Sequence, residues 1–261
     1  MTMQSAQSAS QTSLMTPLQT PLKVKSFNES VETKLIACFS RDKDEIKRAQ
    51  MLRARVFNLS PQDSNLDKDK FDDICLHLIV KDSLSNNIVG YSRVLTSDIV
   101  NSPSEFYTAS EFKIDNIIQP NQRYMEIGRT CVDPNYRSGA VIGLLWSKIG
   151  QFINEHKIDY LMGCASISMQ DGGATAIAIV NHLRENHFTP EHLRVEPNIP
   201  LDRFAVNIDG KSQVPALLKT YIRMGAKVCG EAFIDKDFNV ADVVILLAKK
   251  DIKPRYLRHF S

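Results

Sequence analysis

Residues 124–165 contain the pattern that most restricts what this chain can fold into. Tyr124–Val132 reads as a strand that Asp133-Pro134-Asn135 ends, and Ala140–Ile153 is apolar at helical spacing. Tyr160–Ala165 is a short apolar run typical of a buried strand. A strand, a helix and a second strand of these lengths predict a parallel crossover unit. Because a helix N-terminus presents free N–H groups to anions, this unit is where we expect a ligand.

The flanking segments predict antiparallel strands and further helices. We expect a strand over residues 34–39, a helix from Asp42 or Asp44 to about Phe57, a hairpin from residues 74–80 and 88–95, helices over 173–185 and 214–224, and final strands over 226–234 and 241–247. Residues 104–118 and 186–213 are weakly periodic. The sequence therefore predicts a mixed α/β (α+β) fold. Its sheet is mostly antiparallel with a parallel portion in the middle, and helices flank it.

The composition restricts the partners of the chain. Its 261 residues hold 32 Lys+Arg against 30 Asp+Glu, and the net charge of +2 argues against bulk binding to nucleic acid. No apolar run approaches the roughly 18 residues that a membrane-spanning helix needs. The five cysteines are far apart and odd in number, which is typical of reduced thiols in a cytoplasmic protein. His182, His187 and His192 do not converge on a helix, so no metal site is expected.

The first 22 residues carry no charge and are rich in Gln, Ser and Thr. They lack the features of a secretory signal or a mitochondrial presequence. We therefore expect a disordered tail over residues 1–27 and a single domain over residues 28–261. Two basic segments, residues 41–55 and 249–258, are expected either to meet an acidic partner or anionic lipid, or to be plain solvated surface.

Glu126 and Arg129 interrupt an otherwise apolar strand, and buried charges are costly unless they pair or act on a ligand. One interpretation is a structural ion pair, and the other is a shared site. Residues three apart on a regular strand face opposite sides, so a shared site requires a β-bulge between them. After the strand, Arg137-Ser138-Gly139 opens the predicted helix, where backbone N–H groups can approach a phosphate.

A strand ending at Val132, an arginine five residues later and a turn of small residues into a helix resemble the acyl-CoA-binding motif of the GNAT acyltransferases. That motif usually reads Arg/Gln-x-x-Gly-x-Gly/Ala. Here Ala140 stands in place of the first glycine, and Ile142 replaces the second small residue. This departure argues against ordinary use of acetyl-CoA. A donor carried on a protein presents one phosphodiester rather than the larger anion of CoA, which is our hypothesis for the departure.

Residues 33–260 carry a narrower resemblance, to the ornithine N-alpha-acyltransferases of bacterial ornithine-lipid synthesis. Its elements are Leu52-Arg53-Ala54-Arg55-Val56-Phe57, Phe71-Asp72-Asp73-Ile74-Cys75-Leu76-His77-Leu78, Val89-Gly90-Tyr91-Ser92-Arg93, Glu126-Ile127-Gly128-Arg129, Leu161-Met162-Gly163-Cys164-Ala165-Ser166, residues 215–221, Gly225-Ala226, residues 237–242, Arg255-Tyr256 and His259-Phe260. The same skeleton of Arg, Phe, Asp, Arg, Glu and Arg resembles the acyl-homoserine-lactone synthases.

This resemblance implies a GNAT-like fold and an N-acyltransferase that takes its acyl group from acyl carrier protein. The donor usually carries a 3-hydroxyacyl chain, the acceptor is the α-amine of L-ornithine, and the product is a lyso-ornithine lipid. The thioester is a co-substrate, so no further cofactor is expected. The implied location is the cytoplasm, with peripheral contact to lipid at the inner face of the membrane. The alternatives are an acyl-homoserine-lactone synthase using S-adenosylmethionine, an N-acyltransferase for another amino acid, and a non-catalytic lipid- or carrier-binding module.

The catalytic predictions follow from the proton that the attacking amine must lose. A carboxylate at the reacting centre can accept it, and Glu126 is our first choice. His77 is the second choice, in predicted strand register with Asp73 and Cys75, and its alternative is a core histidine. Backbone N–H groups at a bulge near Gly128 are expected to stabilise the oxyanion of the tetrahedral intermediate.

The binding predictions rest on charge and on the resemblance. Arg129, which we count with the catalytic residues, and Arg93 and Arg55 are expected to hold a carboxylate in a fork that Lys cannot match. The other predicted substrate-binding residues are Phe57, Asp73, Trp146 and Ser166. The residues predicted to bind the phosphopantetheine of the donor are Val132, Arg137, Ser138 and Gly139.

Overall fold

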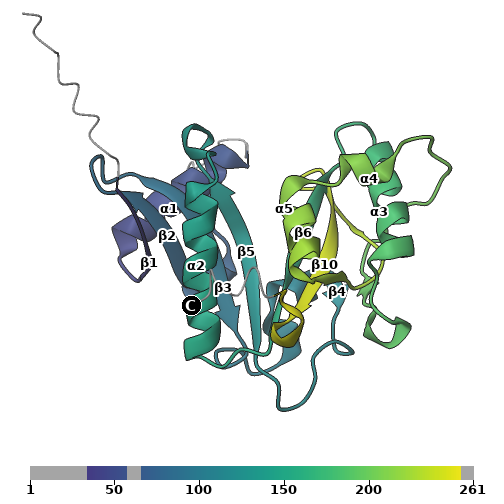
Figure 1. Ribbon diagram of the computed structural model, residues 1–261, viewed down its shortest axis with the longest axis horizontal. Coiled ribbons are helices and arrows are strands. Elements are labelled where there is room, and N and C mark those ends of the chain that lie inside the picture. The colour runs from purple at the N-terminus through teal and green to yellow at the C-terminus, as the bar shows by residue number, and fades with distance from the viewer. Residues whose placement is uncertain (1–33, 58–65, 254–261) are drawn as a thin grey trace, which may run out of the picture. The chain divides into compact units, whose positions relative to one another are not determined.

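The computed structural model describes residues 34–57 and 66–253, which belong to one compact unit, Thr33–Ser261. The predicted tail over residues 1–27 and the second half of the basic segment 249–258 lie outside the described residues. The elements are β1 (Leu35–Ser40), α1 (Lys43–Val56), η1 (Lys70–Asp73), β2 (Leu76–Asp82), β3 (Ile88–Thr96), η2 (Pro103–Glu105), η3 (Tyr107–Ser110), β4 (Phe112–Lys113), β5 (Tyr124–Val132), η4 (Pro134–Tyr136), α2 (Ala140–Glu155), β6 (Tyr160–Ser168), α3 (Ala174–Asn186), η5 (Glu191–Leu193), β7 (Glu196–Pro197), α4 (Gly210–Gln213), α5 (Ala216–Met224), β8 (Lys227–Val228), β9 (Phe233–Asp235), β10 (Val240–Ala248) and η6 (Lys249–Asp251) (Figure 1).

An eight-stranded sheet runs in the order β1-β2-β3-β5-β6-β10-β8, and β9 pairs with β10. Every neighbouring pair is antiparallel except β5 and β6, which are parallel. Strands β4 and β7 form a separate two-stranded sheet. This confirms the predicted mixed sheet, and α2 is the crossover that joins its two parallel strands.

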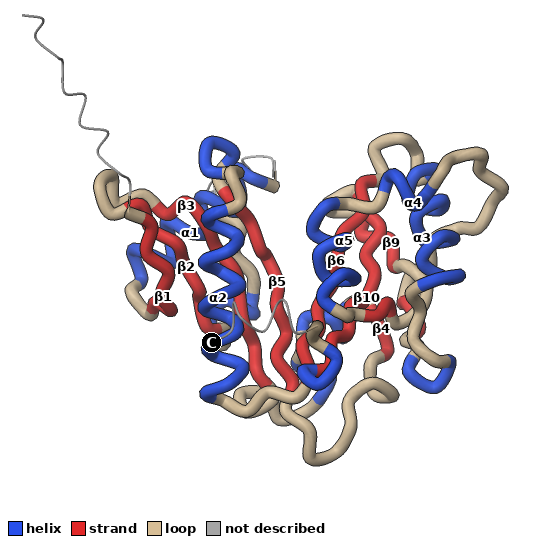
Figure 2. The backbone as a smooth tube through the Cα atoms, in the orientation of Figure 1, coloured by secondary structure: helices blue, strands red, loops and turns tan. Residues whose placement is uncertain are grey.

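Strands β5 and β6 pair only over their first residues. The register runs from Tyr124 opposite Tyr160 to Glu126 opposite Met162, and the strands then diverge (Figure 2). Gly163 lies where they part, and a Cβ there would clash with the backbone carbonyl oxygen of β5. Beyond that point the facing edges of the two strands do not pair with each other within the described residues.

Helices cover both faces of the first half of the sheet. Val141 and Leu145 of α2 share one buried core with Leu78 of β2. Leu52 of α1 shares another with Ile79, the next residue along β2. Because successive side chains of a strand point to opposite faces, β2 packs against both helices at once. In Figure 1, α2 lies in front of strands β1 to β3 and α1 lies behind them.

Local backbone geometry refines the predicted element ends. Asp42, not Asp44, caps α1, and its carboxylate accepts a hydrogen bond from the Glu45 N–H at 2.9 Å. The single strand predicted over residues 226–234 is wrong: it is two short strands, β8 and β9, because the chain turns at Gly230 with φ of 110°. All five cysteines are free thiols. Within residues 34–57 and 66–253, no helix combines the length and the apolar content needed to cross a bilayer.

Candidate active site

A cavity of about 320 Å³ lies where β5 diverges from β6. Its wall includes Phe57, Arg93, Glu126, Arg129 and Ser166, all of which the sequence singled out. These side chains come from the end of α1 and from β3, β5 and β6. The order of strands in the sheet therefore assembles the site. Its volume is at the lower end of the roughly 300–1,000 Å³ typical of small-molecule pockets.

A β-bulge in β5 brings Glu126 and Arg129 to the same cavity. Gly128 pairs with Arg93 and Cys131 pairs with Tyr91, so three steps along β5 oppose two along β3. Arg129 lies in this bulge with φ of 51°, in the left-handed region. The bulge that a shared site requires is therefore present. No ion pair joins Glu126 to Arg129 among the described residues, so they are not a structural pair with each other.

Glu126 is buried and held by three donors. Its Oε2 accepts a hydrogen bond from the Tyr107 N–H at 2.8 Å. Its Oε1 accepts from the Thr108 N–H at 2.7 Å and from the Thr108 hydroxyl at 2.6 Å. Burial raises the pKa of the Glu126 carboxyl above its ordinary value, and these donors oppose that rise. The side chain is thus a positioned carboxylate with increased proton affinity.

Buried arginines and aspartates form an ionic network beside the cavity. Arg93 Nη1 lies 2.6 Å from Asp69 Oδ1 and 3.4 Å from Asp72 Oδ1. Arg53, fully buried, lies 2.8 Å from Asp67 and 2.5 Å from Asp72. Because each cation has carboxylate partners, the network avoids the large cost of an unpaired buried charge. It joins α1, β3 and the segment around η1 into one support for the site.

Arg129 is clamped between two rings. Its guanidinium carbon lies 5.1 Å from the ring centroid of Tyr107 and 4.9 Å from that of Phe238. Nε lies 3.2 Å from Asp67 Oδ2 and Nη2 lies 3.5 Å from Asp69 Oδ2. Among the described residues, Nε still has no acceptor in hydrogen-bonding geometry. Arg129 is therefore a fixed cation in the wall of the cavity.

His77, the second choice for the base, does not line this cavity. Its Nε2 faces the backbone carbonyl of Asp72 at 2.9 Å and its Nδ1 faces the Tyr91 hydroxyl at 2.8 Å. A carbonyl only accepts, so Nε2 carries the proton and Nδ1 accepts from Tyr91. Burial lowers the pKa of His77. The predicted strand register with Asp73 is wrong: Asp73 belongs to η1, is exposed and lies 3.7 Å from Lys68.

The start of α2 gathers the residues predicted to bind the donor. These are Val132, Arg137, Ser138 and Gly139, which lie outside the cavity wall. Gly139 is the N-cap of α2 with φ of 97°, and no side chain caps the helix. Arg137 Nε donates to the carbonyl of Val132 at 3.4 Å. Arg55, also outside the cavity, pairs with Asp133 at 2.6 Å just before this turn.

A second, smaller cavity of about 40 Å³ adjoins the divergence of β5 and β6. Trp146 of α2 lines it and packs edge-on against Tyr221 with 5.5 Å between ring centroids. Ile127, Cys164 and Tyr221 line both cavities. The structure therefore places Trp146 at an apolar space beside the main cavity, and not in its wall.

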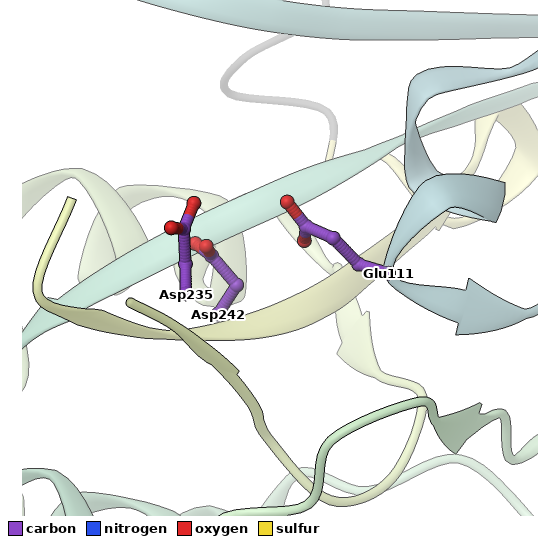
Figure 3. Close-up of side chains that lie close together, drawn as sticks. All are labelled: Glu111, Asp235 and Asp242. Atoms are coloured by element: carbon purple, nitrogen blue, oxygen red, sulfur yellow. The ribbon is translucent and has the colours of Figure 1, made fainter. Parts of the chain in front are cut away.

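Three carboxylates converge at the main cavity, and the sequence analysis did not select them. Oxygen atoms of Glu111, Asp235 and Asp242 lie within 4.8 Å of one another (Figure 3). Asp235 and Asp242 line the cavity, and Glu111 points at them from the end of η3. Ser166 donates to Asp242 Oδ1 at 2.7 Å. Such a group can hold a cation, either an ammonium group or a metal ion.

Crowding changes the titration of this acidic cluster. Burial and the neighbouring Asp242 raise the pKa of Glu111 to about 7. Burial raises the pKa of Asp242 to about 6, and the charge of Asp235 adds to the rise. One signal was readable in the sequence: Asp242 interrupts an apolar strand just as Glu126 does. Glu111 lies in a weakly periodic segment and gave no such signal.

Known proteins share sequence with this chain over part or most of its length. Residues 52–147 match the family model described as an acetyltransferase (GNAT) domain. The chain is 33% identical over 256 residues to an L-ornithine N(alpha)-acyltransferase of Rhizobium meliloti, which covers 89% of this chain and 84% of the relative. It is 30% identical to the enzyme of the same name from Agrobacterium fabrum, over 89% of this chain and 85% of the relative.

A solved structure shares the fold at low identity. TofI, in a ternary complex with an inhibitor and MTA, superimposes with a TM-score of 0.50 and 12% identity. The match covers 87% of this chain and 96% of that one. At this identity the likeness concerns the fold alone, and it confirms the mixed sheet flanked by helices.

Proposed function

Because this chain belongs to the family of the L-ornithine N(alpha)-acyltransferases and is an acyltransferase of the GNAT fold, we propose that it acylates the α-amine of L-ornithine. The donor is a 3-hydroxyacyl chain on acyl carrier protein, and the product is a lyso-ornithine lipid. The observation that carries this proposal is the meeting of Glu126 and Arg129 in one cavity. Amide formation requires a proton acceptor for the attacking amine, and a guanidinium in the same cavity can orient an amino acid by binding its carboxylate.

The acceptor binds through its carboxylate to Arg129, with Arg93 behind it. Both guanidinium groups line the cavity, and Tyr107 and Phe238 fix the plane of Arg129. A guanidinium group can bind a carboxylate through two parallel N–H donors. This arrangement supports an amino acid as acceptor, because it leaves the α-amine in the cavity on the side of Glu126.

Glu126 acts as the general base. The α-ammonium group loses a proton to Glu126, directly or through a water, and the nitrogen then attacks the thioester carbonyl carbon. The C–N bond forms as the carbonyl electrons move to oxygen. Collapse of the tetrahedral intermediate breaks the C–S bond, and the carrier thiol leaves with the second amine proton. Burial raises the pKa of Glu126, which brings it closer to the range useful for proton transfer at neutral pH.

Backbone N–H groups of the bulge stabilise the oxyanion in this proposal. The extra residue of a β-bulge is not paired in the ladder, so its N–H can serve a ligand. Arg129 and Thr130 lie between Gly128 and Cys131, the paired residues of β5, and both line the cavity. Donors fixed before the reaction stabilise the developing charge without reorganisation.

The donor enters from the start of α2. The phosphate of phosphopantetheine binds the free N–H groups around Ser138 and Gly139 and the guanidinium of Arg137. The arm then follows the unpaired edges of β5 and β6 to the cavity. The apolar space beside Trp146 shares Ile127 with the main cavity and suits part of the arm or chain. We place the reaction in the cytoplasm, with peripheral contact to the inner face of the membrane.

The test is mass spectrometry of a competitive reaction. The purified protein receives 3-hydroxyacyl carrier protein with ornithine, lysine, glycine, glutamine and S-adenosylmethionine together. We expect N-acylornithine, greatly reduced for Glu126→Gln and unchanged for the control Glu155→Gln, whose side chain is exposed at the end of α2. If the main product were an acyl-homoserine lactone or an acylated neutral amino acid, the proposal of ornithine as acceptor would be wrong. An intact thioester with all acceptors would favour a binding module.

A further inference from the structure

We infer that Glu111, Asp235 and Asp242 form a subsite for the side-chain ammonium of the acceptor amino acid and select an acceptor that ends in a primary amine. The inference rests on the proposed function and assigns to this chain residues that set acceptor specificity. It depends on three observations: the position of the carboxylates in the cavity, their lack of a cation, and an unpartnered buried oxygen.

The position of the subsite suits an extended amino acid. Asp235 and Asp242 line the same cavity as Glu126 and Arg129. Arg129 packs over the ring of Phe238, in the turn that joins β9 and β10, the strands that hold Asp235 and Asp242. An acceptor whose carboxylate binds Arg129 can therefore extend its side chain toward Asp242. Its α-amine then stays near Glu126.

The carboxylates lack a protein cation. Within the described residues, no Lys or Arg lies within ion-pair distance of Glu111, Asp235 or Asp242. The partners of the two aspartates are neutral: Ser166 serves Asp242, and the backbone N–H groups of residues 237 and 238 serve Asp235 Oδ1. Grouping anions without a cation is unfavourable, which is the arrangement expected of a site that a cationic ligand completes.

Glu111 supplies an independent observation that points to a ligand. The residue is only 4% exposed, and its Oε2 is buried without a hydrogen-bond partner among the described residues. Figure 3 shows its carboxylate directed toward Asp235 and Asp242. A buried oxygen without a hydrogen bond is unfavourable, so a bound N–H donor would remove a penalty.

The spacing of the cluster leaves room for an ammonium group. An R–NH₃⁺ group has three N–H donors, one for each carboxylate. Charge-assisted bonds of about 2.8 Å at tetrahedral angles place the three acceptor oxygens about 4.6 Å apart. The observed oxygens lie within 4.8 Å of one another. The pKa values of Glu111 and Asp242 are raised, so part of the cluster holds protons near neutral pH, and a bound cation would release them.

The test compares ornithine with norvaline, which has the same carbon chain without the terminal amine. We expect wild-type kcat/KM to favour ornithine by at least about 100-fold, since sites built for an N–H donor reject analogues that lack it. Asp242→Asn and Glu111→Gln should each lower kcat/KM for ornithine about tenfold or more, mainly through a higher KM. Neither substitution should change kcat/KM for norvaline appreciably. Asp237 is an exposed carboxylate in the same β9–β10 hairpin, so the control substitution Asp237→Asn should change kcat/KM for neither amino acid. Thermal denaturation checks that the variants fold.

The outcomes separate this inference from the proposed function. Equal use of ornithine and norvaline by the wild type would overturn the subsite and leave N-acyl transfer standing. Ornithine selectivity that survives both substitutions would also overturn it. If neither ornithine nor norvaline were acylated, the proposed function itself would be contradicted. A metal ion is the other possible occupant of the cluster, and calorimetric titration with Mg²⁺ and with Zn²⁺ tests for it. The cluster would be reassigned to a metal if Asp242→Asn abolished metal binding and if a chelator abolished turnover of both ornithine and norvaline.

Discussion

Glu126 shows how two opposing forces set the character of one side chain. Burial raises its pKa, and hydrogen bonds from Tyr107 and Thr108 favour the ionised form. The same bonds join η3 to β5, so the carboxylate also supports the fold. The sequence could predict that Glu126 belongs to a candidate site, because a charge in an apolar strand is costly, and the residue does line the cavity. It could not predict the three donors, since they come from an irregular segment.

Glu126→Gln should lower kcat by about 10²- to 10³-fold, because general-base catalysis usually contributes within the range 10²–10⁴. The amide keeps the size of the carboxyl but places an NH₂ group opposite a backbone donor, which should cost about 1–3 kcal/mol of unfolding free energy. Thiol release from the acyl carrier protein measures turnover, and urea unfolding measures stability. Near-normal kcat in a folded variant would remove Glu126 from the role of base.

The wild-type pH profile gives a second view of the same residue. The base must be deprotonated, so kcat/KM should rise with pH through the pKa of Glu126. Because burial raises that pKa, the rise should fall above the ordinary range of a glutamate. A plateau that extends down to pH 4.5 would contradict this assignment.

Glu111 should make the unliganded protein less stable as pH rises. Its pKa is raised from 4.5 to about 7, so the folded state binds a proton more tightly than the unfolded state. The stabilising contribution is full below pH 4.5 and is lost as pH rises to about 7, by at most about 3 kcal/mol. Glu111→Gln should therefore gain stability relative to wild type between pH 4.5 and 8, measured by urea unfolding. A difference that does not vary with pH would contradict the raised pKa.

At the scale of elements, the crossover from β5 through α2 to β6 positions the chemistry. Sequence periodicity could predict it, because each element has its own apolar pattern. The bulge at Arg129 and the divergence of β5 from β6 could not be predicted, because both depend on pairing with other strands. For the same reason the sequence placed His77 beside Asp73, whereas η1 turns Asp73 away toward solvent.

The glycine that caps α2 and a glycine inside the helix provide a matched pair. Gly139 has φ of 97°, whereas Gly143 is inside the helix and exposed, and a Cβ meets no atom within 4 Å at either position. Gly139→Ala should lower the unfolding free energy by about 1–2 kcal/mol, the cost of a left-handed L-residue. Gly143→Ala should raise it by up to about 1 kcal/mol through helix propensity. Urea unfolding measures both, and equal effects would show that backbone conformation does not govern the start of α2.

At the scale of the whole molecule, the candidate active site takes residues from two parts of the sheet. Arg129 and Glu126 come from the half of the sheet that α1 and α2 cover, and Asp235 and Asp242 come from the β9–β10 hairpin. The acceptor lies between these halves in our proposal. The donor must reach it from the start of α2, where Arg55 and Arg137 gather beside Asp133 and Gly139.

Docking of an acidic carrier protein at this end should depend on charge. Arg137→Glu should raise KM for the acyl carrier protein about tenfold and leave KM for ornithine unchanged, because it repels the phosphate and the acidic carrier together. Added NaCl should raise the wild-type KM for the carrier, since screening weakens attraction between exposed charges. Steady-state kinetics at two salt concentrations measures both effects.

Lys211→Glu is the matched control for this reversal of charge. Lys211 is exposed on α4, away from α2 in Figure 1, and the change in net charge is the same. If overall charge alone attracted the carrier, both variants would raise its KM equally, and the docking site would not be at the start of α2. If only Arg137→Glu does so, the attraction is local. The phosphate, the arm and the cavity then lie along one path from the surface to Glu126.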